Sequence, residues 1–174
     1  MSPSKALRVE RLNEIGARSH ELSALLVDCV DSGASVGFLP PVSAEEARGY
    51  WEGLTGELRS GSRALLVALV EQQVAGAVQL ALCMKKNGSH RAEVEKLMVH
   101  TAHRHGGLGR ALLGSVEQLA RECGRTLLVL DTRTGDVASA LYRKCGYVEA
   151  GQVPGYALSA DGRLDATTYF YKQL

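Results

Sequence analysis

Residues 94–124 limit the possible folds of this chain more than any other segment. They run from an apolar, strand-like stretch through three glycines into a stretch whose apolar residues recur at helical spacing. Glycines at this place let the backbone pass close to a bulky ligand, and the free N–H groups at the start of a helix point toward it. Positively charged or donor side chains surround the turn, namely His103, Arg104, His105 and Arg110. The segment therefore predicts a site for phosphate or pyrophosphate.

Two common nucleotide-binding motifs do not fit this turn. A Walker A loop continues with Lys and then Ser or Thr after its last glycine, whereas Gly109 is followed by Arg110 and Ala111. A Rossmann fingerprint lies at the first strand–helix turn and reads G-x-G-x-x-G, and HGGLGRALLG is out of that register. Glycines before a helix are also common in ordinary turns, so a purely structural role stays open.

Residues 108–123, behind the turn, have the pattern of an amphipathic helix. Its apolar stripe, which we expect to pack on a sheet, consists of Leu108, Leu112, Val116, Leu119 and Cys123. Glu117 and Arg121 lie four residues apart and are expected to pair on the outer face. The pattern predicts a helix anchored on the sheet, with its first turn toward a ligand.

The remaining elements follow from periodicity and turn signals. We expect an edge strand at 6–12, helices at 16–33 and 43–61, a hairpin of 63–70 with 74–84, a strand at 91–99, a buried strand at 126–132, a helix at 136–147 and a final hairpin in 151–174. Ser43 and Glu46 form a capping-box signature, Asn87-Gly88 suits a turn with positive φ, and Asp161-Gly162 separates two alternating segments. This order predicts an α/β (α+β) fold with a mixed sheet.

Composition and charge narrow the class of protein. The chain has 174 residues, 45% of them hydrophobic, and no linker or repeat, which predicts one globular domain over residues 1–174. A formal net charge of +1 disfavours general nucleic-acid binding, because an anion must be held by a local cluster. No apolar run reaches the roughly 20 residues of a spanning helix, and residues 1–12 lack an apolar signal region, so we expect a cytoplasmic protein without a membrane partner. The widely spaced cysteines are expected to be buried reduced thiols.

The turn has the pattern R-x-x-G-x-G over residues 104–109, with KLMV before it and ALYRKCGY downstream. This pattern resembles the GCN5-related N-acetyltransferases, the GNAT superfamily, and the resemblance covers nearly the whole chain. It implies one GNAT-type domain whose mixed, mostly antiparallel central sheet is splayed and flanked by helices. It also implies acetyl-CoA as the co-substrate, without a metal. The turn would bind the pyrophosphate through Arg104, His105, Gly106, Gly107, Leu108, Gly109 and Arg110.

The same resemblance assigns a role to the strand before the turn. In that family this strand diverges from its neighbour, so that backbone groups, here of Leu97, Met98 and Val99, meet the acetyl-pantetheine arm. The physical reason is that a splayed pair leaves unpaired amides, which can hydrogen-bond the arm and polarise the thioester carbonyl.

Four further segments are similar to the tabtoxin-resistance-type acetyltransferases, which N-acetylate a small amino-acid-like β-lactam toxin. They are GASVGF, NGSHRAEVEKLMV, LLVLDT and PGYALSADGRLDAT. The similarity implies that Glu93 and Asp131 are the acidic residues at the acceptor amine, and that Tyr142 lies beside the thioester sulfur. Gly135 departs from the family, because many members have Asn there; a glycine could open room or aid the turn.

The chemistry of amine acetylation suits these residue types. An alkyl ammonium with a pKa near ~10 must lose a proton before it attacks, and a carboxylate can take that proton directly or through water. Glu93 shares strand parity with Leu97, so it can face the cleft, and a bulge there would aim it further; the alternative is a solvated strand residue. Asp131 ends an apolar strand at its carboxyl edge, where ligands commonly bind; the alternative is a cap for the TRTGD turn.

Tyr142 is the candidate that would protonate the departing CoA thiolate. The helix at 136–147 is expected to place Val137, Leu141 and Cys145 on its apolar stripe. Tyr142 is one position beyond Leu141, so its ring can leave that stripe and bring the hydroxyl into the cleft. The alternative is an interior tyrosine that ties the helix to the sheet.

These observations predict an N-acetyltransferase that moves the acetyl group directly to a primary amine of a small molecule, an amino-acid-like toxin or antibiotic among them. No activated nucleophile is evident, because Cys83 and Cys145 fall in a strand and on a helix stripe. The alternatives are a non-catalytic CoA-binding or sensing module and a protein-modifying acetyltransferase, against which a pocket-forming helix with Tyr50 and Trp51 argues weakly. The histidines of the turn lack ligand spacing for a metal, and the protein is expected to be a monomer or homodimer.

Overall fold

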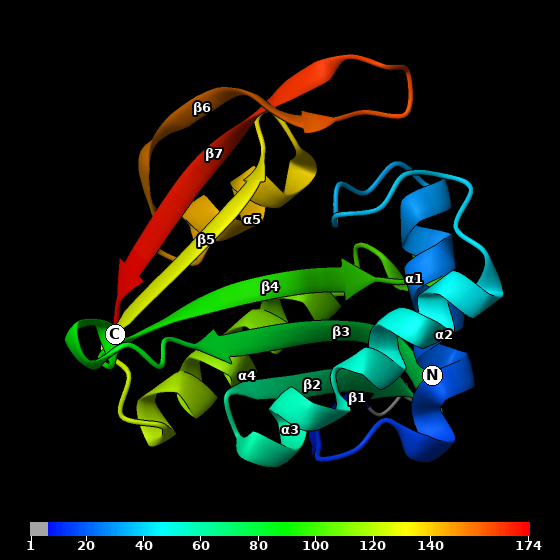
Figure 1. The fold of residues 1–174 in the computed structure, drawn as a ribbon, viewed down its shortest axis with the longest axis horizontal. Helices are drawn as coiled ribbons and strands as arrows, with labels where there is room; N and C mark the ends of the chain where they lie inside the picture. Colours follow the sequence, from blue (N-terminus) through cyan, green and yellow to red (C-terminus); the bar gives the residue numbers. More distant parts are fainter. Residues whose placement is uncertain (1–6) are drawn as a thin grey trace, which may run out of the picture.

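Residues 7–174, which the computed structural model describes, form a seven-stranded sheet with helices on both faces (Figure 1). The strands are β1 (Leu7–Leu12), β2 (Arg63–Val70), β3 (Gln73–Leu82), β4 (Arg91–Val99), β5 (Leu127–Arg133), β6 (Val148–Leu158) and β7 (Leu164–Gln173). The helices are α1 (Ser19–Asp31), α2 (Ala44–Gly53), α3 (Thr55–Ser60), α4 (Leu108–Glu122) and α5 (Val137–Lys144), with short 3-10 helices at Gly16–Arg18, Lys86–Gly88 and Thr101–His103.

The sheet is mixed, as the element order predicted. Its strand order is β1-β2-β3-β4-β5-β7-β6, and neighbouring strands are antiparallel except β4 and β5, which run parallel. β1 lies at one edge, which confirms the predicted edge strand, although Ala6 of that prediction lies outside the described residues. That all of residues 1–174 form one domain stays a prediction.

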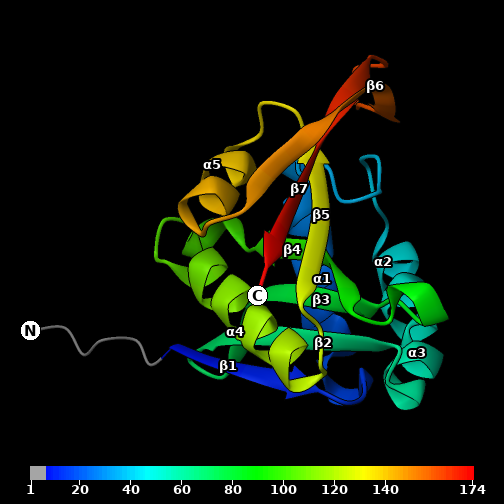
Figure 2. The same ribbon diagram turned by 90° about the vertical axis from the view of Figure 1, so that its left-hand side faces the viewer.

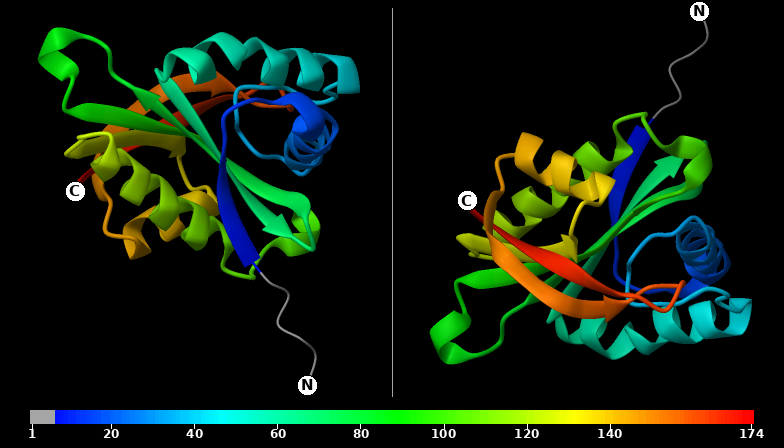
Figure 3. Two further views of the ribbon diagram at one scale, coloured as in Figure 1. Left: turned by 90° about the horizontal axis from the view of Figure 1, so that it is seen from below. Right: turned by 90° about the horizontal axis from the view of Figure 1, so that it is seen from above.

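Two apolar cores lie on opposite faces of the sheet, under the two groups of helices that Figures 2 and 3 show on either side of it. α4 and α5 cover one face, and the predicted stripe of α4 is confirmed because Leu108, Leu112, Val116 and Leu119 are buried while Cys123 is partly buried. α1, α2 and α3 cover the other face, where the largest fully buried side chain is that of Trp51. Each core fixes its helices against the strands that carry the site.

The helix predicted over residues 43–61 is divided at Leu54 into α2 and α3. Its start is correct, since the Ser43 side chain accepts a hydrogen bond of 3.0 Å from the backbone N–H three residues on. Gly53 and Gly56 flank the division, and each glycine costs about 1 kcal/mol relative to alanine in a helix interior. The sequence therefore tolerates a break there, and Leu54 is buried at the break.

The turn at Asn87-Gly88 also differs from the prediction. It forms a short 3-10 helix, and neither residue has a positive φ. Gly88 is needed for space instead, because a Cβ there would lie 2.5 Å from the Cys83 sulfur. The turn with positive φ angles connects β2 and β3, at Glu71 (52°) and Gln72 (67°).

The stripe predicted for α5 is rotated in the structure. Val137 is 82% exposed, whereas Tyr142 is only 6% exposed. The Tyr142 ring packs against Tyr147 and Phe170, with ring centroids 5.7 and 5.9 Å apart. An aromatic ring buries more apolar area than valine, so the cluster, which the local spacing does not reveal, sets the rotation of the helix.

Glu117 of α4 does not pair with Arg121 on the outer face, contrary to the prediction. It is buried, and its carboxylate accepts a hydrogen bond of 2.7 Å from the Lys172 ammonium of β7. Lys172 also donates to the backbone carbonyl of Cys145 at 2.7 Å. A buried charge needs such a partner, and this one lies 55 residues away in the sequence, beyond the reach of helical spacing.

Candidate active site between the splayed strands

β4 and β5 separate soon after they begin. They pair only over residues 91–93 of β4 and 127–129 of β5, and Figure 1 shows them diverging beyond that point. A cavity of about 760 Å³ opens in the gap. Backbone groups along the facing edges, within the described strands, have no cross-strand partner there, so they are free to bind a ligand.

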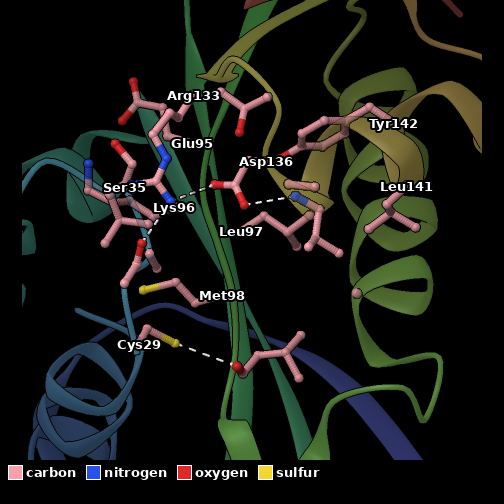
Figure 4. Close-up of a pocket in the computed structure, with 18 of the residues that line it drawn as sticks. Cys29, Ser35, Glu95, Lys96, Leu97, Met98, Arg133, Asp136, Leu141 and Tyr142 are labelled. Carbon is pink, nitrogen blue, oxygen red and sulfur yellow. Dashed lines mark hydrogen bonds and ion pairs between the residues drawn. The ribbon is translucent and has the colours of Figure 1, made fainter. Parts of the chain in front are cut away.

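The cavity has two sides, separated by β4 (Figure 4). The turn side is formed by residues 103–105, 107–110 and 137–138 together with Leu141 and Tyr142. The loop side is formed by residues 34–37 of the α1–α2 loop together with Glu95 and Lys96. Two ligands, one bound on the turn side and one on the loop side, could therefore come into contact at the opening between β4 and β5.

A bulge in β4 decides which of its side chains face the cavity. Between the pairs Ala77–Met98 and Gln79–Glu95, β3 has one residue and β4 has two, and the extra residue of β4 is Lys96 with a φ of 52°. The bulge ends the strand parity on which the prediction for Glu93 rested. Residues 94–99 line the cavity, whereas Glu93 lies just before them and outside the lining.

The glycine turn exposes the start of α4. Gly107 has a φ of 82° and precedes the helix without a side-chain cap, so the first N–H groups of α4 keep their hydrogen-bonding capacity for a ligand. A Cβ at Gly107 would meet nothing within 4 Å, whereas one at Gly109 would lie 3.2 Å from a Leu141 methyl group. Gly106 lies outside the lining. The cradle is open and has the donors that a pyrophosphate requires.

Arg104 is already engaged within the protein. Its guanidinium donates to the Ser32 hydroxyl at 2.7 Å and to the Val99 carbonyl at 3.3 Å. These bonds tie the turn to the end of α1 and to the last residue of β4. Arg110 and His105 also line the turn side, and His105 has a φ of 63°.

Tyr142 reaches the cavity from within the core, so it packs as an interior tyrosine and also lines the cavity, while its role toward the thiolate stays a prediction. It lines the turn side while its ring packs in the aromatic cluster of α5. Burial, with a smaller effect of Asp136 and Asp131, raises the pKa of Tyr142 above its ordinary value. The phenol therefore stays protonated at neutral pH and can act as a donor.

The two predicted carboxylates lie near the point where the strands part. Asp131 lines the cavity and accepts a hydrogen bond of 2.7 Å from the Thr167 hydroxyl. Burial raises the pKa of Glu93, and the charges of Glu95 and Asp131 add to the effect. A carboxylate with a raised pKa is a better proton acceptor than an ordinary one.

Asp131 does not cap the turn that follows it. The cap is Asp136, whose side chain accepts a hydrogen bond of 2.8 Å from the first N–H of α5. Gly135 has a φ of 83°, so glycine suits the backbone of this turn, in line with one of the two explanations for its departure from the family. Arg133 crosses to the α1–α2 loop, where it donates to the Gly33 carbonyl at 2.9 Å.

Glu95 and its partners escaped the sequence analysis. Arg63 of β2 binds Glu95 at 2.6 Å, Glu57 at 2.8 Å and the amide oxygen of Gln79 at 2.8 Å. Gln79 in turn donates to the Tyr50 hydroxyl at 2.8 Å. The only signal in the sequence was that Arg63 and Gln79 are polar residues in otherwise apolar strands. That signal does not reveal that their side chains converge with Glu95 beneath the loop side.

Other kinds of site are absent from the part of the chain that the structure describes. Within residues 7–174, no three His, Cys, Asp or Glu side chains are placed to hold a metal ion. None of the helices formed by these residues is both long and apolar enough to span a membrane. All four cysteines are free, with Cys29 buried and the others half-buried.

A mixed sheet opened between parallel strands, beside an uncapped helix start with a glycine turn, offers backbone donors for the phosphates and the carbonyl groups of a ligand such as a CoA thioester. Residues 26–147 match the model of the acetyltransferase (GNAT) family, and the chain belongs to that family. It is an N-acetyltransferase, and its co-substrate is acetyl-CoA, for which the open turn and unpaired strand edges provide donors.

Curated relatives agree with this assignment. An N-acetyltransferase encoded in the hisH-hisA intergenic region of Azospirillum brasilense, itself uncharacterised, is 31% identical over 128 residues, which is 72% of this chain and 74% of the relative. N-acetyltransferase 8B of Rattus norvegicus is 38% identical over 89 residues, which is 49% of this chain and 40% of the relative.

Solved structures share the fold along nearly the whole chain. Ribosomal-protein-alanine N-acetyltransferase from Brucella melitensis has a TM-score of 0.78 at 26% identity and covers 97% of this chain and 99% of its own. The Salmonella typhimurium protein yncA, solved with its cofactor acetyl-CoA, has a TM-score of 0.78 at 22% identity and covers 97% and 94%. The splayed, mixed sheet flanked by helices is thus the GNAT fold.

Proposed function

We propose that this N-acetyltransferase acetylates a primary amine of a small molecule, with amino-acid-like toxins and antibiotics as the main candidates. The observation that carries the proposal is the cavity of about 760 Å³ that reaches both sides of β4. A cavity of this size accommodates the end of acetyl-CoA and a compact acceptor together, so the acetyl group can move directly between them. The resemblance of four segments to the tabtoxin-resistance type favours the same class of acceptor.

The proposal places acetyl-CoA on the turn side. The pyrophosphate would be held by backbone and side-chain groups of Arg104, His105, Gly106, Gly107, Leu108, Gly109 and Arg110. Since Arg104 already binds Ser32 and Val99, its contribution is to position the turn as much as to supply charge. The backbone of Leu97, Met98 and Val99 would contact the acetyl-pantetheine arm along the unpaired edge of β4.

Proton transfers are assigned to three side chains. Glu93 is the base, acting through water, because its pKa is raised and it directly precedes the residues of β4 that line the cavity. Asp131, which lines the cavity, holds the acceptor's ammonium before the proton leaves. Tyr142 donates to the departing thiolate, since burial keeps its hydroxyl protonated.

The small size of the acceptor is supported by the way the loop side is closed. The bond from Arg133 to Gly33 joins the end of β5 to the α1–α2 loop, and Tyr156 of β6 also lines the cavity. A protein-modifying enzyme needs a groove that admits a polypeptide, and the relation to ribosomal-protein-alanine N-acetyltransferase keeps that function as the second candidate.

A spectrophotometric thiol-release assay tests these alternatives. We expect CoA release with some member of a panel of amino acids, amino-β-lactams, aminoglycosides and polyamines, and none with peptides that begin with alanine. Release with the peptides alone would establish the protein-modifying function. Tight acetyl-CoA binding without turnover on any amine would establish the CoA-sensing module.

We also propose a cellular location and an oligomeric state for the enzyme. A cytoplasmic location suits four free cysteines, because the cytoplasm keeps thiols reduced and supplies acetyl-CoA. The protein is proposed to act as a monomer or homodimer.

A further inference from the structure

Lys96 occupies an unusual position in the cavity wall. It is the extra residue of the β4 bulge, and its φ of 52° places it in the left-handed region, which costs a residue with a side chain about 1 kcal/mol. Glycine would adopt this backbone without cost. The bulge therefore accounts for the backbone conformation but not for a lysine side chain.

The Lys96 side chain extends to the loop side of the cavity. Its ammonium lies 5.7 Å from the centre of the Tyr50 ring, and a Cβ built on Gly37 would be 3.4 Å from it. Figure 4 shows Lys96 beside Ser35, on the side of β4 opposite Tyr142. The ammonium is thus remote from the glycine turn that is assigned to the phosphates of acetyl-CoA.

Lys96 lacks a close counter-ion, although carboxylates are near. Within residues 7–174 no carboxylate lies within ion-pair distance of its ammonium, and Glu95, its neighbour in the chain, is bound at 2.6 Å by Arg63. Glu93 and Asp131 act on Lys96 only at longer range. Burial lowers the pKa of Lys96 below its ordinary value, so an anion that arrived at the loop side would stabilise its charged form.

We propose that Lys96 is a specificity-determining residue that binds a carboxylate or similar anionic group of the acceptor, while Asp131 and Glu93 receive its amine. The acceptor is then a zwitterion with an amine and an anion, which separates amino acids from polyamines and aminoglycosides. The inference rests on the proposed small-molecule function and adds to it the group that the loop side recognises. A half-buried ammonium with a cation–π partner and an open face is suited to a charge-assisted hydrogen bond.

Matched acceptors test the inference. A panel of α-amino acids, each paired with the decarboxylated amine of the same side chain, is assayed by thiol release with the wild-type enzyme and with Lys96→Met, Lys96→Arg and Lys85→Met. Lys85 is exposed and lies outside the cavity, so its variant is the control for the loss of one positive charge. Calorimetry with acetyl-CoA shows whether each variant still binds the co-substrate.

We expect the wild type to prefer the amino acid of a pair. In Lys96→Met the ratio of kcat/KM between amino acid and amine should fall roughly 10- to 100-fold, with the amine and acetyl-CoA little affected, because one hydrogen bond to a charged group is lost. Lys96→Arg should recover part of the ratio, and Lys85→Met should leave it unchanged.

Three results would overturn the inference while leaving the small-molecule function intact. These are equal use of both members of every pair by the wild type, an equal loss for both in Lys96→Met, and a loss of acetyl-CoA affinity with the ratio unchanged. If the wild type acetylates no member of this panel but does acetylate an aminoglycoside or a polyamine, the inference fails and the small-molecule function stands. If it acetylates no small amine at all, both fail.

Discussion

Tyr142 is almost fully buried, yet it forms part of the cavity wall. Most buried tyrosines only pack, whereas this one meets the opening between β4 and β5 from the aromatic cluster of α5. The cluster fixes the ring, and a fixed donor loses little entropy when it protonates a leaving group. The packing of Tyr142 in the core is therefore compatible with the proposed role of its hydroxyl as a proton donor.

Removal of that hydroxyl should affect turnover and spare binding. Tyr142→Phe retains the ring's packing and deletes the donor to sulfur, so we expect kcat to fall on the order of 10²-fold while the affinity for acetyl-CoA changes little. Steady-state kinetics and calorimetry measure the two quantities.

Tyr147→Phe is the matched control for this prediction. Tyr147 packs on Tyr142 and lies outside the cavity lining, and its buried hydroxyl lies beside the Glu117 carboxylate of α4. It should retain full activity. Wild-type kcat in Tyr142→Phe over the whole pH range would make Tyr142 a packing residue only.

Among the elements, the glycine turn and α4 work as one unit. The turn leaves the first N–H groups of the helix open, and the apolar stripe of α4 holds those groups in place against the sheet. The same helix is joined to β7 by the Glu117–Lys172 ion pair at its far side. The role of the first turn of α4 in binding and the role of the Glu117–Lys172 pair in stability can therefore be tested with separate variants.

A side chain in the turn should block acetyl-CoA. Gly107→Val places a branched side chain at a φ of 82°, where the cradle is open, so we expect acetyl-CoA binding to be lost in calorimetry. The strained backbone should cost about 1–2 kcal/mol of folding free energy, which leaves the fold intact.

Gly114→Ala serves as the control in the same helix. A Cβ there would meet nothing within 4 Å, so this variant should bind acetyl-CoA normally and gain up to about 1 kcal/mol of stability. Unchanged affinity in a folded Gly107→Val variant would refute the assignment of the turn to pyrophosphate.

Loss of Lys172 should destabilise the protein. Lys172→Met leaves the buried Glu117 carboxylate without its partner, and we expect a loss of about 3–5 kcal/mol in chemical denaturation. The double variant Glu117→Gln with Lys172→Met should regain much of that loss, because it removes the unpaired charge. Additive losses in the double variant would show that the two residues do not depend on each other.

At the scale of the whole molecule, the raised pKa of Glu93 makes stability depend on pH, and in the proposed mechanism the same carboxylate affects activity. Burial raises its pKa above the ordinary value of 4.5, with Glu95 and Asp131 adding to the effect. The folded protein therefore binds this proton more readily than the unfolded chain does. The resulting contribution to stability is fully present below pH 4.5 and is lost as the pH rises through the raised pKa.

Glu93→Gln should thus be more stable than the wild type at neutral pH and less active. We expect the difference in Tm, variant minus wild type, to be more positive at pH 7 than at pH 4. The variant's kcat/KM for the amine should be lower by on the order of 10²-fold at neutral pH, and the loss should shrink at high pH, where free amine is abundant.

Asp131→Asn provides the comparison for Glu93→Gln. It should lower kcat/KM for the amine as well, while acetyl-CoA binding stays nearly unchanged in both variants. Wild-type activity of both at neutral pH would refute the carboxylate mechanism, and a Tm difference that is independent of pH would refute the raised pKa of Glu93.

The sequence alone specified the features that depend on neighbouring residues. The glycine turn, the apolar stripe of α4, the cap at Ser43 and the order of strands and helices are all local patterns, set by backbone preferences and helical or strand periodicity. The resemblance of the R-x-x-G-x-G turn to the GNAT family added the fold and the candidates Asp131 and Tyr142, both of which line the cavity, while the binding of acetyl-CoA by the turn stays a prediction.

Only the tertiary structure decided which side chains face the cavity and which lie in the core. The bulge at Lys96 interrupts the alternation of side chains between Glu93 and Leu97. The packing of the aromatic cluster buries Tyr142 on α5. The hydrogen bond from Lys172 stabilises Glu117 in a buried position. Each of these outcomes depends on a partner far away in the sequence. The free energy of burying a ring or pairing a charge with such a partner exceeds the local preference, and local preference is all that spacing along the chain can express.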